Sequence, residues 1–129
     1  MKKTTVLTAV ALALVLVALG ATASAEQRFE STVTIHAVEK AHGTFTAEGE
    51  VKSSKKACEK QRKVVLYGRQ ASDPQHPDRL GADRTNDAGA WRVSGVDSLG
   101  LQSIQAQAKP KQIAAGTCKR ARSRTIHFA

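Results

Sequence analysis

The sequence predicts an all-β protein, a single seven-stranded β-sandwich that follows a cleaved signal helix. Apolar and polar residues alternate over short runs, and Gly, Asn, Asp and Pro separate these runs. After residue 25, no stretch keeps the spacing of apolar residues that an amphipathic helix requires. The segment 26–129 is long enough for one filled core but not for two. We therefore expect one domain over residues 26–129.

The first twenty-five residues have the pattern of an export signal. Lys2 and Lys3 form a positive head, an apolar run covers residues 6–19, and the small residues 23–25 (ASA) suit a signal peptidase. The apolar run is too short to cross a bilayer comfortably as a permanent helix. We therefore expect cleavage before Glu26 and a secreted or extracellular product of the cell envelope, with no transmembrane anchor in the mature chain.

The first two expected strands are amphipathic. In Glu30–Val38 the apolar residues alternate with threonine and histidine, and residues 41–43 (AHG) turn the chain. In Thr44–Val51 residues 45, 47, 49 and 51 form the core face, and the four between them form a polar face.

The third expected strand, Lys63–Arg69, has four apolar residues in succession, which is typical of a strand covered on both faces. Residues 73–78 contain two prolines, each of which removes a backbone donor, so this segment is expected to be a loop. A fourth, weaker strand is expected at Arg79–Thr85.

The last three expected strands are Ala90–Ser94, Leu101–Ala108 and Ser123–Phe128. A tight turn at Asn86–Gly89 introduces the first of them, in which Trp91 is the expected core anchor. Residues 97–100 form another turn, and a proline at position 110 ends the following strand. This core pattern accounts for every aromatic residue after the leader, so no aromatic platform for a sugar is expected.

Cys58 and Cys118 are the two cysteines of the chain. In an exported protein an even number of cysteines predicts a disulfide, because the compartment is oxidising. In the chain-entropy model, a disulfide that closes a loop of this size stabilises the fold by about 4 kcal/mol. The two cysteines lack the close spacing of redox or zinc motifs.

The chain is basic, with a formal charge of +9. A disulfide would bring two basic segments together, one around Cys58 and one just after Cys118, and would so form one anion-binding patch. The patch residues are Lys52, Lys55, Lys56, Lys60, Arg62, Lys63, Lys119, Arg120, Arg122 and Arg124. The competing interpretation is that these cations keep a short loop soluble and protect sheet edges.

Residues 64–67 (VVLY) and 82–93 (ADRTNDAGAWRV) combine a central strand with a threonine strand, an Asp-x-Gly turn and an aromatic strand. This pattern resembles the transthyretin-like or carboxypeptidase-regulatory-like modules of exported bacterial proteins. The resemblance implies an Ig-like or transthyretin-like β-sandwich. The catalytic hydroxyisourate hydrolases of that superfamily end in Tyr-Arg-Gly-Ser, whereas this chain ends in TIHFA, so their activity is not expected.

Two pairs of side chains carry an alternative function, a small secreted hydrolase or metal-binding protein. Glu48 and Glu50 lie two apart on one strand face, roughly 6 to 7 Å from each other, which overlaps the spacing of a general acid and base. His36 and His127 would meet if the first and last strands were neighbours, forming a zinc or copper site. A solvated polar face and exposed strand histidines are the simpler interpretations.

The predicted function is a secreted structural or binding module that attaches through the basic patch to an anionic cell-envelope polymer or another exported protein. We expect a monomer that is not an enzyme, with no catalytic residues, metal or cofactor. The two basic segments contain no aromatic stacking groups, so sequence-specific nucleic-acid binding is not expected.

Overall fold

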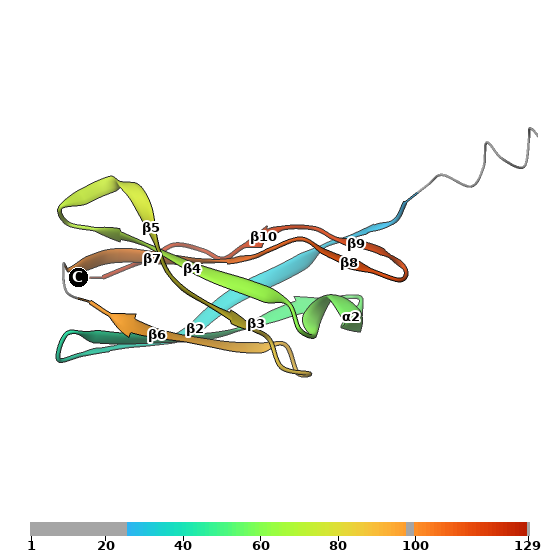
Figure 1. Ribbon diagram of the computed structural model, residues 1–129, viewed down its shortest axis with the longest axis horizontal. Coiled ribbons are helices and arrows are strands. Elements are labelled where there is room, and N and C mark those ends of the chain that lie inside the picture. Colours follow the sequence, from blue (N-terminus) through green and yellow to red (C-terminus); the bar gives the residue numbers. More distant parts are fainter. Residues whose placement is uncertain (1–25, 98–99, 129) are drawn as a thin grey trace, which may run out of the picture.

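The computed structural model describes residues 26–97 and 100–128. The expected signal peptide at residues 1–25 lies outside them, as do residues 98–99 of the expected turn. Most of the described residues lie in strands and only one short helix is present among them, which confirms the predicted all-β class (Figure 1). They form β1 (Arg28–Phe29), β2 (Ser31–Ala41), β3 (Thr44–Ser53), α2 (Lys56–Glu59), β4 (Lys63–Gln70), β5 (Asp73–Arg84), β6 (Ala90–Val96), β7 (Leu101–Ala108), β8 (Lys111–Ile113), β9 (Gly116–Cys118), β10 (Ala121–Arg122) and β11 (Ile126–His127).

Two sheets face each other across the core (Figure 1). The lower sheet has the order β2-β3-β6, and the upper sheet has the order β10-β7-β4-β5, with β11 also paired to β7. A third, small sheet, β1-β9-β8, lies with α2 at one end of the molecule, and the C-terminus lies at the other end (Figure 1). The architecture is therefore that of a β-sandwich with an added end piece.

The core lies between the inner faces of the upper and lower sheets. Trp91 is only 2% exposed, as expected for an anchor, and it pairs in register with Gly49 of β3. The absence of a side chain at Gly49 leaves room for the indole ring. The other members of the buried cluster are Val33, Phe45, Ala47, Val51, Val64, Leu66, Val93, Leu101, Ile104, Ala106 and Ala108.

The predicted strand count of seven is too low, since the described residues contain eleven strands. Of the expected strand Ser123–Phe128, only Ile126–His127 forms a strand, β11. Ser123 lies before it and is buried, and its hydroxyl accepts a hydrogen bond from the amide of Ala106 at 2.9 Å. Four strands, β1, β8, β9 and β10, and the helix α2 were not predicted, since each has only two to four residues.

The predicted loop at residues 73–78 is wrong, because these residues form the first half of β5. β5 is the edge strand of the upper sheet and pairs only with β4 there. A proline on an edge strand can leave its missing donor toward solvent instead of toward a neighbouring strand. Register shifts on both sides of Tyr67 and Gly68 also mark this pairing as irregular.

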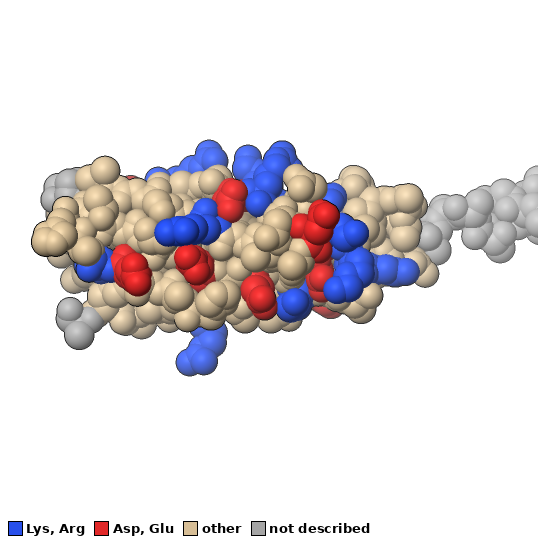
Figure 2. Space-filling view, turned by 90° about the horizontal axis from the view of Figure 1, so that it is seen from below, with Lys and Arg blue, Asp and Glu red and all other residues tan. Residues whose placement is uncertain are grey.

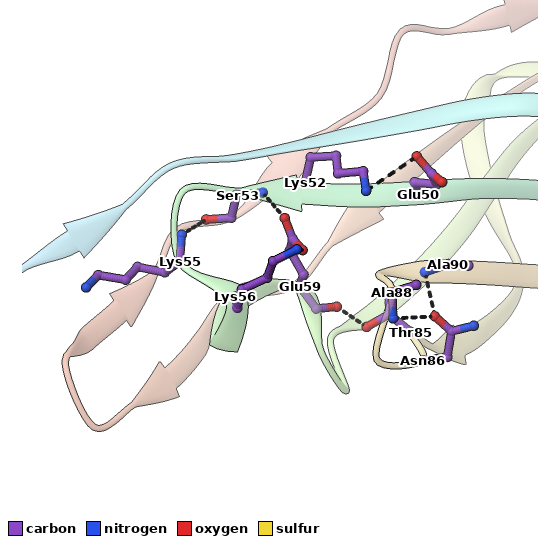
Figure 3. A network of polar contacts seen from close by, with 10 residues as sticks. All are labelled: Glu50, Lys52, Ser53, Lys55, Lys56, Glu59, Thr85, Asn86, Ala88 and Ala90. Atoms are coloured by element: carbon purple, nitrogen blue, oxygen red, sulfur yellow. Dashed lines mark hydrogen bonds and ion pairs between the residues drawn. The ribbon is translucent and has the colours of Figure 1, made fainter.

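The tight turn before β6 has the expected form. Asn86 accepts hydrogen bonds through its side-chain oxygen from the amides of Ala88 and Ala90, at 2.9 and 3.0 Å (Figure 3). Gly89 has a φ of +83°, and its carbonyl accepts a hydrogen bond from the amide of Val51 at 2.8 Å. The turn therefore also connects β6 to the end of β3.

The predicted disulfide between Cys58 and Cys118 is confirmed, and both residues are fully buried. Beside it lies Arg62, which is also fully buried. This position corrects the prediction that Arg62 belongs to an exposed anion-binding patch. Its charge is solvated inside the protein by polar groups of the protein itself.

The Arg62 guanidinium joins four segments of the chain. It donates to the carbonyl oxygens of Lys109 at 2.6 Å, Cys58 at 2.9 Å and Lys119 at 2.5 Å, and to the hydroxyl of Ser31 at 3.0 Å. Burial lowers the pKa of Arg62 from its ordinary value. Because two of these carbonyls belong to Cys58 itself and to the residue after Cys118, the guanidinium and the disulfide fix the same junction.

Replacing Gly49 with alanine is expected to destabilise the protein by at least about 2 kcal/mol. The added methyl group would overlap the carbonyl oxygen of Thr34 and lie 2.6 Å from Cζ2 of Trp91. Gly43→Ala is the control, because nothing lies near that position and only its left-handed φ of +79° is strained, at about 1 kcal/mol. Urea unfolding measures both, and equal losses would contradict the argument.

Replacing Arg62 with methionine is expected to reduce the free energy of unfolding by more than about 3 kcal/mol, because three buried carbonyls would lose their donor. Arg62→Lys should give an intermediate loss, since an ammonium group cannot reach all four partners. Arg122→Met, at an exposed position, should stay within about 0.5 kcal/mol. If urea unfolding gave the same small loss for Arg62→Met as for Arg122→Met, the role of the buried guanidinium would be refuted.

Candidate anion-binding face

Four residues of the predicted patch, at the end of the molecule that contains the disulfide, already contact other side chains of the protein. Lys52 lies 3.9 Å from Glu50, Lys56 lies 3.3 Å from Glu59 and Lys119 lies 2.5 Å from Glu30. The ammonium group of Lys55 lies 5.2 Å from the centre of the Phe29 ring. Most of the positive charge at this end is therefore compensated locally.

Glu59 shows how tightly this end is built. Its carboxylate is 4% exposed and accepts a hydrogen bond from the amide of Ser53 at 2.8 Å (Figure 3). The hydrogen bond from the amide of Ser53 and the neighbouring Lys56 lower the pKa of this carboxyl, against the opposing effect of burial. The backbone carbonyl of Glu59 accepts a hydrogen bond from the hydroxyl of Thr85. Lys56 therefore acts as a structural partner.

The remaining predicted patch residues divide between several places. Lys60 follows α2, and its carbonyl accepts a hydrogen bond from Lys111 at 2.6 Å. Arg124 lies beside a cavity between β2 and β11. Lys63, Arg120 and Arg122 lie at or beside the outer face of the upper sheet.

The outer face of the upper sheet is free of acidic residues at its paired positions. Residues directly opposite each other in an antiparallel pair point to the same side of the sheet. Four rows of residues point outward in this way. The first joins Lys63 and Arg84, and the second joins Arg122, Gln107, Val65 and Ala82. The third joins Gln105, Tyr67 and Arg79, and the fourth joins His127, Ser103 and Arg69. Asp83 turns away from this face, since its carboxylate accepts a hydrogen bond from the amide of Arg92 in β6.

The outer face of the lower sheet carries charges of both signs. Figure 2 looks onto this side of the molecule and shows Asp and Glu interspersed with Lys and Arg. Glu48, for example, lies opposite Arg92 in the register, and their charged groups are 3.5 Å apart. The two faces of the sandwich thus differ in charge pattern, and the one-signed face is that of the upper sheet.

The centre of the one-signed face is Tyr67, which contradicts the expectation that every aromatic residue packs in the core. Its hydroxyl accepts a hydrogen bond from the ammonium group of Lys109 at 2.9 Å, and that group lies 5.2 Å from the ring centre. This hydrogen bond, together with the charges of Lys109, Arg79 and Arg120, holds the pKa of the phenol below its ordinary value. We call Lys63, Arg79, Arg84, Lys109, Arg120 and Arg122, grouped around Tyr67, the cationic face.

A cavity of about 350 Å³ opens beside Tyr67. It is lined by Gly68 of β4, by Gln105 and Gln107 of β7, and by Lys109 and Arg120. Pro77 of the β4–β5 hairpin closes another side. In Figure 1 this hairpin curls away from the lower sheet, so that it rises beyond the plane of the upper sheet.

Sequence reasoning missed Tyr67 and three cations of the cationic face, Arg79, Arg84 and Lys109. The prediction grouped cations that are close together in the sequence. The cationic face instead consists of residues from neighbouring strands, and only every second residue of a strand points to this side of the sheet. The alternation of Gln105, Gln107 and Lys109 with apolar residues was a usable signal, because it marks one polar side of β7. The partner strands could not be known without the register.

The residues of the alternative function lie elsewhere. Glu48 and Glu50 are on the outer face of the lower sheet, each close to a cation. His36 is exposed in β2, whereas His127 belongs to β11 in the other sheet, so their strands are not paired as a shared site would require. Among residues 26–97 and 100–128, no three His, Cys, Asp or Glu side chains form a metal-binding group.

No protein-family model, curated protein or solved structure matches this chain. The resemblance to transthyretin-like modules therefore stays a prediction from residues 64–67 and 82–93.

Tyr67 is the single tyrosine of the chain, so phenolate absorbance reports this side chain alone. Because the hydrogen bond from Lys109 and the nearby positive charges lower its pKa, we expect half-ionisation below the ordinary value of 10.0. Lys109→Met should move the midpoint upward, whereas Lys52→Met, at the opposite face, should leave it in place. A midpoint at or above 10.0 in the unaltered protein would show that the cations do not surround the phenol.

Proposed function

We propose that this chain is an exported binding module that attaches to an anionic polymer of the cell envelope through the cationic face. The observation that carries the proposal is the absence of acidic residues from the outward rows of the upper sheet. Neighbouring strands are about 4.8 Å apart, so cations on adjacent strands present a closely spaced array to a linear polyanion. Such an array attracts polyanions over a distance and releases them as salt screens the charges.

The compartment is part of this proposal. The leader at residues 1–25 has the pattern of an export signal. The buried disulfide supports an oxidising environment, where such bonds form and persist. Within the described residues, no helix has the length and apolar character needed to cross a membrane.

We also propose that the sandwich is of the Ig-like or transthyretin-like type and that the module acts as a monomer without catalysis. Two observations support the type: two sheets pack over one core, and the chain passes from the edge of one sheet in β5 to the edge of the other in β6. No reaction is assigned to Glu48 and Glu50, because their neighbours Arg92 and Lys52 neutralise them at an open surface.

Retention on immobilised dextran sulfate tests the binding function. We expect retention to fall steeply as salt rises from about 50 to about 200 mM. The double variant Arg120→Gln, Arg122→Gln should lower the slope of log affinity against log salt by roughly one to two, since one ion contact is lost per residue. The control, Lys52→Gln with Arg92→Gln, removes the same charge from the lower sheet.

The control variant should keep most of the retention of the unaltered protein. If both double variants weaken retention equally, net charge alone explains binding and the cationic face has no special role. Retention that does not respond to salt would contradict an electrostatic attachment altogether.

A further inference from the structure

The cavity beside Tyr67 is large enough to hold a small ligand. Its volume of about 350 Å³ lies at the lower end of the range of small-molecule sites, roughly 300 to 1,000 Å³. It is one of several hollows on the surface of the described residues, and it is the one that the cations Lys109 and Arg120 of the cationic face line. A polymer lying on this face could therefore place one of its units inside the protein surface.

One cation of the cavity, Lys109, is held in position before any ligand arrives. The ammonium group of Lys109 donates to the Tyr67 hydroxyl at 2.9 Å and to the side-chain oxygen of Gln107 at 3.4 Å. An ammonium group has three donors, so one remains for a ligand. Arg120 lines the same cavity, and its planar fork suits the two oxygens of a carboxylate. This side of the cavity favours a single anionic group.

The rest of the lining is neutral and rich in hydrogen-bonding groups. Gln105 and Gln107 are adjacent outward residues of β7, and Thr125 lies beside them in the cavity wall. The amide of Gln105 is oriented by its hydrogen bond to the carbonyl of Ser123 at 3.0 Å. Primary amides and hydroxyls both donate and accept, which is the chemistry that recognises sugar hydroxyls. A bare polyphosphate offers only acceptors and could give the amide oxygen of Gln105 no donor.

We infer that this cavity binds one acidic sugar unit, a hexuronate, with its carboxylate toward Lys109 and Arg120 and its hydroxyls toward Gln105 and Gln107. This inference rests on the proposed function and deepens it, since it names the class of polymer as an acidic polysaccharide. The remaining cations of the face, among them Arg122 and Lys63, then contact neighbouring units of the same chain.

Isothermal titration calorimetry with three short oligomers tests the inference on the exported chain. The probes are tetragalacturonate, linear tetrapolyphosphate and neutral maltotetraose. We expect tetragalacturonate to bind at least about tenfold tighter than tetrapolyphosphate, although the phosphate oligomer carries no less charge. Maltotetraose should bind at least about tenfold more weakly than tetragalacturonate, because it lacks the carboxylate.

A charge-neutral variant separates recognition from attraction. Gln107→Ala is expected to weaken tetragalacturonate binding about tenfold, because the sugar hydroxyls lose a hydrogen-bonding partner, and to weaken retention on dextran sulfate much less. Gln102→Ala is the matched control, since Gln102 is exposed on the same strand and outside the cavity. Its affinity for tetragalacturonate should equal that of the unaltered protein, and circular dichroism should show that both variants fold.

The outcomes distinguish the two proposals. If tetrapolyphosphate binds as tightly as tetragalacturonate, or if Gln107→Ala has no effect, the sugar site is refuted while attachment to polyanions stands. If maltotetraose binds as tightly as tetragalacturonate, the carboxylate is not recognised and the inference fails. If neither charged oligomer binds and dextran sulfate does not retain the protein, the proposed function fails as well.

Discussion

The burial of one guanidinium beside the disulfide is the constraint on which the rest of this structure depends. Moving the charge of Arg62 out of water is costly unless strong hydrogen bonds replace its hydration. Its four donated hydrogen bonds supply that replacement, and three of them go to main-chain carbonyls. Two of those carbonyls belong to Lys109 and Lys119, which lead into the segments that carry the wall of the cavity. The backbone beside Lys109 and Arg120 is thus anchored by a buried junction, while Tyr67 and Gln107 also hold the ammonium group of Lys109 on the outer face.

The charge of the upper sheet has no evident structural purpose. Like charges that lie close together repel each other and destabilise the compact state. Lys111 of β8, in the small third sheet, has its pKa lowered first by burial and then by the charges of Arg62 and Arg84. The lower sheet neutralises its charges with cross-strand pairs such as Glu48 with Arg92, so the same chain contains the alternative solution. The upper sheet therefore keeps cations without acidic partners, whereas the lower sheet of the same protein pairs its cations with carboxylates. Binding of an external anion explains this difference better than a requirement of folding.

The sequence predicted those features that depend on local chemistry. The alternation in residues 44–51, the bounds of Leu101–Ala108, the turn at Asn86–Gly89 and the pairing of the cysteines all follow from short-range patterns or from composition. It could not predict the burial of Arg62, because an arginine in a basic run looks exposed until its distant carbonyl partners are known. The predicted patch included Lys63, Arg120 and Arg122 of the cationic face. The other three cations were missed for the same reason, since the face joins residues of four strands through the register.

The proline-rich start of β5 connects the fold to the cavity. Prolines and register shifts on an edge strand prevent another chain from pairing with it. Here the shifts on both sides of Tyr67 and Gly68 also bend the β4–β5 hairpin, which curls beyond the upper sheet (Figure 1). Because of that bend Pro77 reaches the cavity, and the half-buried Tyr67 lies at the foot of the hairpin. The segment that breaks the strand pattern in the sequence therefore supplies the wall that turns a flat charged sheet into a recess with room for a ligand.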